Sequence, residues 1–77
     1  MDIKETIKVY IQKNFSIDEL SDSQSLITNG LIDVLGLIEL TTFLEDTFNI
    51  KIADEEIVSD NFNSLSKLVA FVHCKQP

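Results

Sequence analysis

Cysteine and histidine are nearly absent from this 77-residue chain, which contains one of each. A single cysteine, Cys74, cannot form an internal disulfide, and no His/Cys cluster has the spacing of zinc ligands. His73 and Cys74 are neighbours in sequence, so on a helix their side chains point in different directions and do not form a catalytic pair. The composition therefore predicts a cytoplasmic protein that is not an enzyme and has no metal site.

Basic residues are also few: 6 Lys and Arg stand against 13 Asp and Glu, and the formal net charge is −7. Nucleic-acid binding depends on clustered Lys and Arg, so this balance argues against a nucleic-acid partner. An acidic protein favours basic protein partners. The simpler alternative is that the acidic residues only keep a small protein in solution.

Long apolar runs are missing as well. No segment approaches the ~20 apolar residues needed to cross a membrane. The first residues, MDIKETIKVYIQ, lack the pattern of a signal peptide. Two Gly, one Pro and 44% hydrophobic residues are typical of a compact helical protein rather than a disordered one. We therefore expect residues 1–77 to form one free-standing, monomeric, all-α domain.

Apolar residues recur with helical spacing near the start of the chain. One face of a helix predicted over residues 2–14 carries Ile3, Ile7, Tyr10 and Ile11, and Asp2 is available to cap this helix. The following stretch, residues 16–29, is rich in Ser, Asp and Asn and has no helical period. We expect it to form a long loop, a kind of segment that is often functional. Three apolar residues should hold this loop on the core: Leu20, Leu26 and Ile27.

A second helix is predicted from Val34 to about Asn49, with Asp33 as its N-cap. Its core face comprises Leu37, Leu40, Leu44 and Phe48. The opposite face carries an apolar centre bordered by carboxylates, here called the acid-rimmed strip: Leu35, Ile38, Glu39, Thr42, Glu45 and Asp46. Either the long loop or the third helix covers this strip, or the strip is a docking surface that attracts basic partners.

Two further helices are predicted after the extended residues 50–52. Asp54 should cap a short third helix in the segment DEEIV, and Ser64 should cap the last helix. The core positions of that last helix are Leu65, Leu68, Val69 and Val72. Residues from His73 onward are expected to fray. The predicted fold is a small four-helix bundle with three longer helices, one short helix and a long loop between the first two.

These motifs, in this order, resemble the acyl and peptidyl carrier proteins. The run G-L-I-D-V-L-G-L-I-E-L-x3-L-E-D-x-F-N-I-K-I is followed by D-E-E and then N-F-N-S-L-S-K-L-V-A-F-V, so the likeness covers nearly the full chain. In that family a Ser after the Asp carries a 4′-phosphopantetheine arm, whose thiol holds an acyl or aminoacyl group as a thioester. The resemblance implies a non-catalytic carrier that takes part in a biosynthetic pathway.

The resemblance also assigns roles to residues. It places Val34 at the attachment position, Gly30 and Leu31 in the preceding loop, and Asp33 and Leu35 in the attachment motif. It assigns the acid-rimmed strip to partner binding. The implied partners are a phosphopantetheinyl transferase, a ligase that loads the acyl or aminoacyl group, and downstream biosynthetic enzymes with basic docking surfaces.

Val34 departs from the family pattern in a way that matters chemically. An isopropyl side chain has no oxygen to accept phosphopantetheine, so the arm is expected only if position 34 were serine. Other hydroxyl residues lack the Asp-x-Leu context: Ser25, Thr28, Thr41 and Thr42. One interpretation is a Ser-to-Val substitution that locks an ordinary carrier in its unmodified form, which the otherwise intact motif favours. The alternative is a natural carrier-like interaction or regulatory module that acts without an arm.

Overall fold

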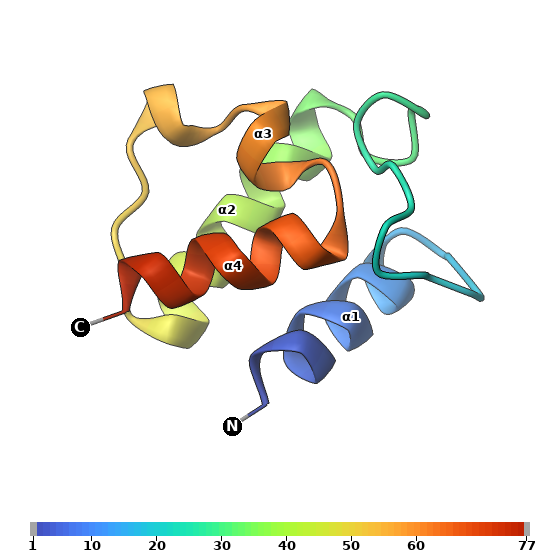
Figure 1. The fold of residues 1–77 in the computed structure, drawn as a ribbon. Coiled ribbons are helices and arrows are strands. Elements are labelled where there is room, and N and C mark those ends of the chain that lie inside the picture. Colours follow the sequence, from blue (N-terminus) through green and yellow to red (C-terminus); the bar gives the residue numbers. More distant parts are fainter. Residues whose placement is uncertain (1, 77) are drawn as a thin grey trace.

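A computed structural model describes residues 2–76, which are helical with connecting loops and contain no strand (Figure 1). The described residues form four α-helices and one 3-10 turn: α1 (Ile3–Asn14), α2 (Val34–Phe48), η1 (Asp54–Glu56), α3 (Ser59–Phe62) and α4 (Leu65–Lys75). Helix α4 packs against both α1 and α3. The predicted all-α bundle of three longer helices, one short helix and a long first loop is confirmed.

The three longer helices begin at the predicted caps. The Asp2 carboxylate accepts the Glu5 N–H at 3.1 Å, and the Asp33 carboxylate accepts the Gly36 N–H at 2.8 Å. The Ser64 hydroxyl accepts an N–H in the same way at the start of α4, at 3.2 Å. Each cap satisfies a backbone donor that the helix itself leaves without a partner.

The core draws on every α-helix and on the long loop. Its buried apolar residues are Ile7, Ile11, Leu20, Leu26, Ile32, Leu40, Leu44, Phe48, Ile50, Phe62, Leu65, Leu68, Phe71 and Val72. The predicted core faces are therefore confirmed, although Ile3, Tyr10, Leu37 and Val69 are only half-buried. Leu20 and Leu26 hold the loop on the core as expected, while Ile27 lies at its edge.

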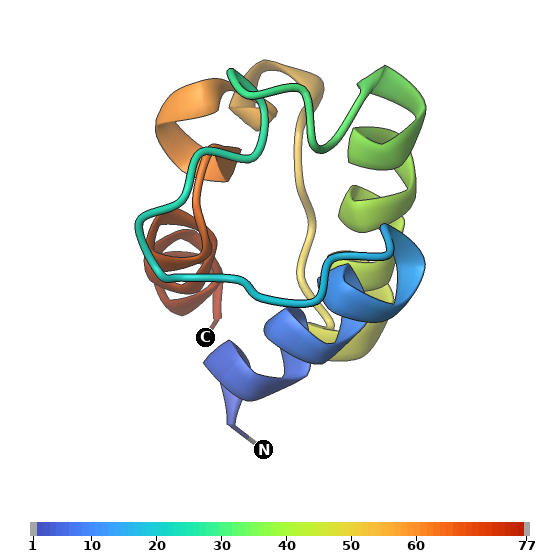
Figure 2. The same cartoon turned by 90° about the vertical axis from the view of Figure 1, so that its right-hand side faces the viewer.

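The long loop, residues 15–33, runs from the end of α1 across one side of the molecule to the start of α2 (Figure 2). Asp22 fixes its middle at two points. Its carboxylate forms an ion pair with the Lys4 ammonium at 2.6 Å, and its carbonyl accepts the Ser66 N–H at 3.0 Å. Because the ion pair is exposed, the backbone bond and the burial of Leu20 are the stronger anchors.

The third helix lies later in the chain than predicted. Asp54–Glu56 form a single 3-10 turn whose N-cap is Ala53, not Asp54. The Glu56 carboxylate accepts the Ala53 N–H at 2.9 Å and so closes the turn. The helical segment α3 follows at Ser59–Phe62, where the Phe62 side chain is fully buried. The predicted helical turn in DEEIV is therefore present at Asp54–Glu56, but its N-cap is Ala53 rather than Asp54, and the α-helical segment, which buries Phe62, follows only at Ser59.

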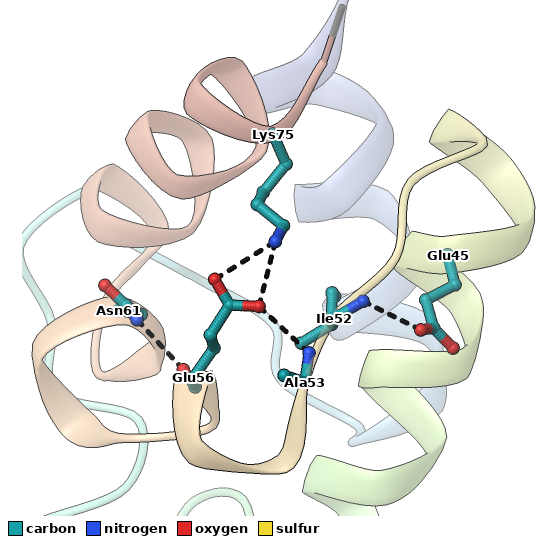
Figure 3. Close-up of polar contacts among 6 residues, drawn as sticks. All are labelled: Glu45, Ile52, Ala53, Glu56, Asn61 and Lys75. Atoms are coloured by element: carbon teal, nitrogen blue, oxygen red, sulfur yellow. Dashed lines mark hydrogen bonds and ion pairs between the residues drawn. The ribbon is translucent and has the colours of Figure 1, made fainter.

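The prediction of fraying from His73 was also wrong, because α4 continues to Lys75. The Lys75 ammonium lies 2.9 Å from Glu56 Oε1 and 3.0 Å from Glu56 Oε2 (Figure 3). The Gln76 N–H donates to the Val72 carbonyl at 3.0 Å. These contacts join the end of α4 to η1, which lies 19 residues away in sequence.

Candidate functional site

Position 34 is the first residue of α2, and it lies at the end of the bundle opposite both termini (Figures 1 and 2). The Val34 side chain is 72% exposed. Asp33, immediately before it, is held by its bond to the Gly36 N–H. The side chain of residue 34 is therefore presented to solvent at the N-terminus of a capped helix, where backbone N–H groups favour a negatively charged ligand.

The acid-rimmed strip begins at the same end of α2. Leu35 is 70% exposed and Ile38 is 55% exposed. Thr42, Glu39 and Asp46 are exposed as well. Neither the long loop nor the third helix covers these residues, so that alternative was wrong. The strip therefore places an accessible apolar centre and carboxylates directly beside position 34.

Glu45 differs from the other members of the strip. It is half-buried, and its Oε2 accepts the Ile52 N–H at 2.9 Å (Figure 3). The same carboxylate thus holds the extended segment after α2 against the helix. Glu45 still adds negative charge to the rim, but part of its hydrogen-bonding capacity is used inside the molecule.

The structure gives Gly36 a role that sequence reasoning missed. A Cβ atom at this position would lie 2.6 Å from Phe15 Cε1 and 3.0 Å from Ile32 Cγ2. The phenyl ring of Phe15, at the start of the long loop, therefore packs directly on the first turn of α2. Glycine in the first turn of a predicted helix was the available signal, because glycine there often marks a close approach by another group.

Asn63 is a second residue that sequence reasoning missed. It lies between α3 and α4, and its Oδ1 accepts backbone N–H groups from three consecutive loop residues, Leu26, Ile27 and Thr28. The partners are 35 to 37 residues away in sequence. No local pattern indicates such a contact, so only the three-dimensional structure reveals it.

Comparison with known proteins gives two kinds of result. No protein-family model matches the chain. The D-alanyl carrier protein of Streptococcus pyogenes serotype M5 (strain Manfredo) is 37% identical over 71 residues, which cover 90% of this chain and 89% of that protein. The D-alanyl carrier protein of Streptococcus suis (strain 98HAH33) is 35% identical over 74 residues, covering 94% and 92%.

The chain belongs to the acyl carrier protein family. These relatives are 35–37% identical to this chain over about nine-tenths of its length. This similarity confirms the resemblance to carrier proteins that was seen in the residues around Asp33 and in the last helix. As carrier proteins, the members of this family are not catalysts themselves.

Carrier proteins of this family generally use a 4′-phosphopantetheine prosthetic group. Its covalent attachment needs an oxygen acceptor, and the Val34 side chain contains only carbon and hydrogen. The nearest hydroxyls on α2 are engaged: Thr41 donates to the Leu37 carbonyl at 2.8 Å, and Thr42 donates to the Ile38 carbonyl at 3.2 Å. The side chain at the start of α2 in this carrier protein therefore does not fit covalent attachment of the arm.

The remaining reactive residues of this carrier protein do not converge on position 34. His73 and Cys74 are exposed on the last turns of α4. Among residues 2–76, no group of three or more His, Cys, Asp or Glu side chains could hold a metal ion. No helix within that range is long and apolar enough to cross a membrane.

Tyr10 shows how α1 is fixed beside this surface. Its ring stacks on Phe43 of α2 with centroids 3.9 Å apart. Burial raises the pKa of the Tyr10 hydroxyl, and the Glu39 carboxylate raises that pKa further. Tyr10 therefore stays neutral at physiological pH, and its stacked ring packs α1 against α2.

Proposed function

We propose that this protein presents position 34 and the acid-rimmed strip to the enzymes of a carrier cycle, and that Val34 keeps it in the unmodified form. The supporting observation is the 72% exposure of residue 34 at a capped helix N-terminus, directly beside exposed Leu35 and Ile38. A carrier needs an accessible attachment point next to a surface that its partners recognise. The exposed residue 34 and the exposed apolar strip beside it support both requirements, and the Val34 side chain lacks only the acceptor oxygen.

The proposed partners follow from the charge and chemistry of this surface. A phosphopantetheinyl transferase, a loading ligase and downstream biosynthetic enzymes would dock through basic surfaces that complement Glu39 and Asp46. Because the relatives are named D-alanyl carrier proteins, we propose an amino acid of that kind as the cargo of a version with serine at position 34. The same resemblance supports Gly30, Asp33 and Leu35 as the residues that frame the attachment position.

The direct test restores the missing oxygen. The protein, its Val34→Ser variant and a Leu35→Ser control are incubated with coenzyme A and a phosphopantetheinyl transferase of broad specificity, and each is weighed intact. Val34→Ser should gain the mass of one phosphopantetheine. The other two should gain none, because Leu35→Ser exposes a hydroxyl one residue away from the attachment position. An unmodified Val34→Ser variant would contradict the carrier proposal, and a modified parent protein would show that the position is wrong.

An interaction module that works without an arm is the second candidate. The observation that favours it is the isopropyl group of Val34, which extends the exposed apolar surface formed by Leu35 and Ile38. The carrier and the interaction module predict different results when the gene is replaced in cells. If a strain lacking the gene recovers only with the Val34→Ser version, Val34 reflects a substitution that locks an ordinary carrier. Full recovery with Val34 in place would support the module.

A further inference from the structure

Asn63 connects the junction of α3 and α4 to the long loop that leads into α2. Its Oδ1 accepts the N–H groups of Leu26 at 3.2 Å, Ile27 at 2.8 Å and Thr28 at 3.2 Å. The Asn63 carbonyl also accepts the Leu26 N–H, at 2.8 Å. Because an amide oxygen accepts hydrogen bonds and an amide NH₂ does not, three converging donors fix the orientation of this side chain.

Hydrogen bonds continue from this anchor toward α2. The Ile32 N–H donates to the Leu26 carbonyl, and the Gly30 N–H donates to the Ile27 carbonyl, both at 3.0 Å. Gly30 has φ +73°, a conformation that glycine adopts at little cost. Leu26 and Ile32 are buried on the core. Residues 26–32 thus form a closed turn that ends directly before the N-cap of α2.

From this geometry we propose that Asn63 is a positioning residue for position 34. By holding the turn of residues 26–32, it sets the point at which Asp33 and residue 34 enter α2. Without its Oδ1, the N–H groups of Ile27 and Thr28 would lose their acceptor, and the turn would have to move toward water to satisfy them. The consequence for recognition of position 34 rests on the proposed carrier function.

The test uses three substitutions in the Val34→Ser background. Asn63→Ala removes the acceptor. Asn63→Asp keeps an oxygen in the same place, and a carboxylate accepts backbone N–H groups at least as well as an amide does. Asn61→Ala is the matched control, because Asn61 lies two residues earlier and donates to the Glu56 carbonyl at 2.9 Å, away from the loop (Figure 3).

Two measurements are made at a temperature at which every variant is folded. Amide hydrogen exchange of Ile27, Thr28 and Gly36 is followed by NMR in the unmodified protein, and kcat and KM are determined for the transferase. For Asn63→Ala we expect faster exchange at all three amides and a loss of kcat/KM on the order of tenfold to a hundredfold. The loss should fall mainly on kcat, because the acid-rimmed strip that docks the enzyme is unchanged. Asn63→Asp and Asn61→Ala should behave like Val34→Ser alone.

Three results would overturn the inference: an unchanged kcat/KM for Asn63→Ala, an equal loss for Asn61→Ala, or a failure of Asn63→Asp to restore the rate. If the transferase does not modify Val34→Ser at all, the carrier proposal fails. The hydrogen-exchange data alone then test whether Asn63 positions the start of α2. Faster exchange at Ile27 and Thr28 with an unchanged rate at Gly36 would then show that Asn63 holds the loop without positioning the start of α2. Faster exchange at all three would support the positioning role.

Discussion

The substitution Gly36→Ala should destabilise this protein, although the same change in the first turn of most helices is stabilising. Replacing a helical glycine by alanine ordinarily gains about 0.5–1 kcal/mol, because glycine loses more backbone entropy on folding. Here the new methyl group would lie 2.6 Å from Phe15 Cε1 and 3.0 Å from Ile32 Cγ2. Ile32 is buried and cannot move freely.

The expected loss of stability is the cost of the steric contact minus the gain in backbone entropy. Forcing an extra methyl group into a packed region costs about 1–3 kcal/mol. After the entropic gain is subtracted, Gly36→Ala should lower the free energy of unfolding by about 1 kcal/mol. For a domain of this size such a loss corresponds to a fall of roughly 4–8 °C in Tm.

The assay is urea unfolding of four proteins, monitored by far-UV circular dichroism: the parent, Gly36→Ala, Phe15→Ala and the double variant. Phe15→Ala removes the ring that the new methyl group would strike. In that background the 2.6 Å contact is gone and the 3.0 Å contact with Ile32 remains, so Gly36→Ala should lower the free energy of unfolding less than it does in the parent. The double-mutant cycle isolates the contact between the two positions. If Gly36→Ala stabilises the protein equally with and without the ring, the packing of Phe15 on α2 does not constrain position 36.

Two further predictions concern the two faces of α2 and the contact between η1 and α4. Leu40→Ala and Leu44→Ala truncate core side chains, so each should lower the free energy of unfolding by roughly 2–5 kcal/mol. Leu35→Ala and Ile38→Ala change exposed side chains, so each should alter that free energy by no more than about 0.5 kcal/mol and should instead weaken partner binding. Equal losses of stability in both pairs would contradict the exposure of the strip. Hydrogen bonds from the Ala53 N–H and the Lys75 ammonium lower the pKa of the Glu56 carboxylate. The ionised carboxylate therefore stabilises the fold at any pH above the ordinary glutamate pKa. This stabilisation is lost as the pH falls through the lowered pKa of the folded protein. Urea midpoints measured across acidic pH should therefore fall less steeply for Glu56→Gln than for the parent, and parallel curves would refute this role.

Local patterns predicted the three longer helices well, because each combines a cap with a repeated apolar face. Asp2, Asp33 and Ser64 all cap as expected, and the apolar spacing identified most of the buried residues of these helices, but not Phe71. The same spacing placed Leu35 and Ile38 opposite the core face, although it left open whether the long loop or the third helix covers them. These features depend on residues within a few positions of one another, so the sequence alone is sufficient.

The remaining features depend on contacts between distant parts of the chain. Lys75 at the end of α4 pairs with Glu56 of η1, and the Phe62 side chain of α3 is fully buried. A four-residue helix such as α3 is too short to show a helical repeat of apolar residues. The acidic residues 54–56 resemble a helix N-terminus more closely, so the prediction placed the short helix there. The hydrogen bonds of Asn63 could not be predicted from the spacing of residues in the sequence, because its three partners lie in a loop without a repeating pattern.

The exposure of Val34 has a consequence for how such a protein behaves in a cell. A side chain that is 72% exposed at the first residue of a helix contributes little to the free energy of unfolding. Proteases and chaperones respond to the unfolded population, so they would treat a copy with valine and a copy with serine alike. If both copies were made, folding stability would not make their abundance differ. The valine copy would then occupy the same partner surfaces as a competitor that folding surveillance cannot remove.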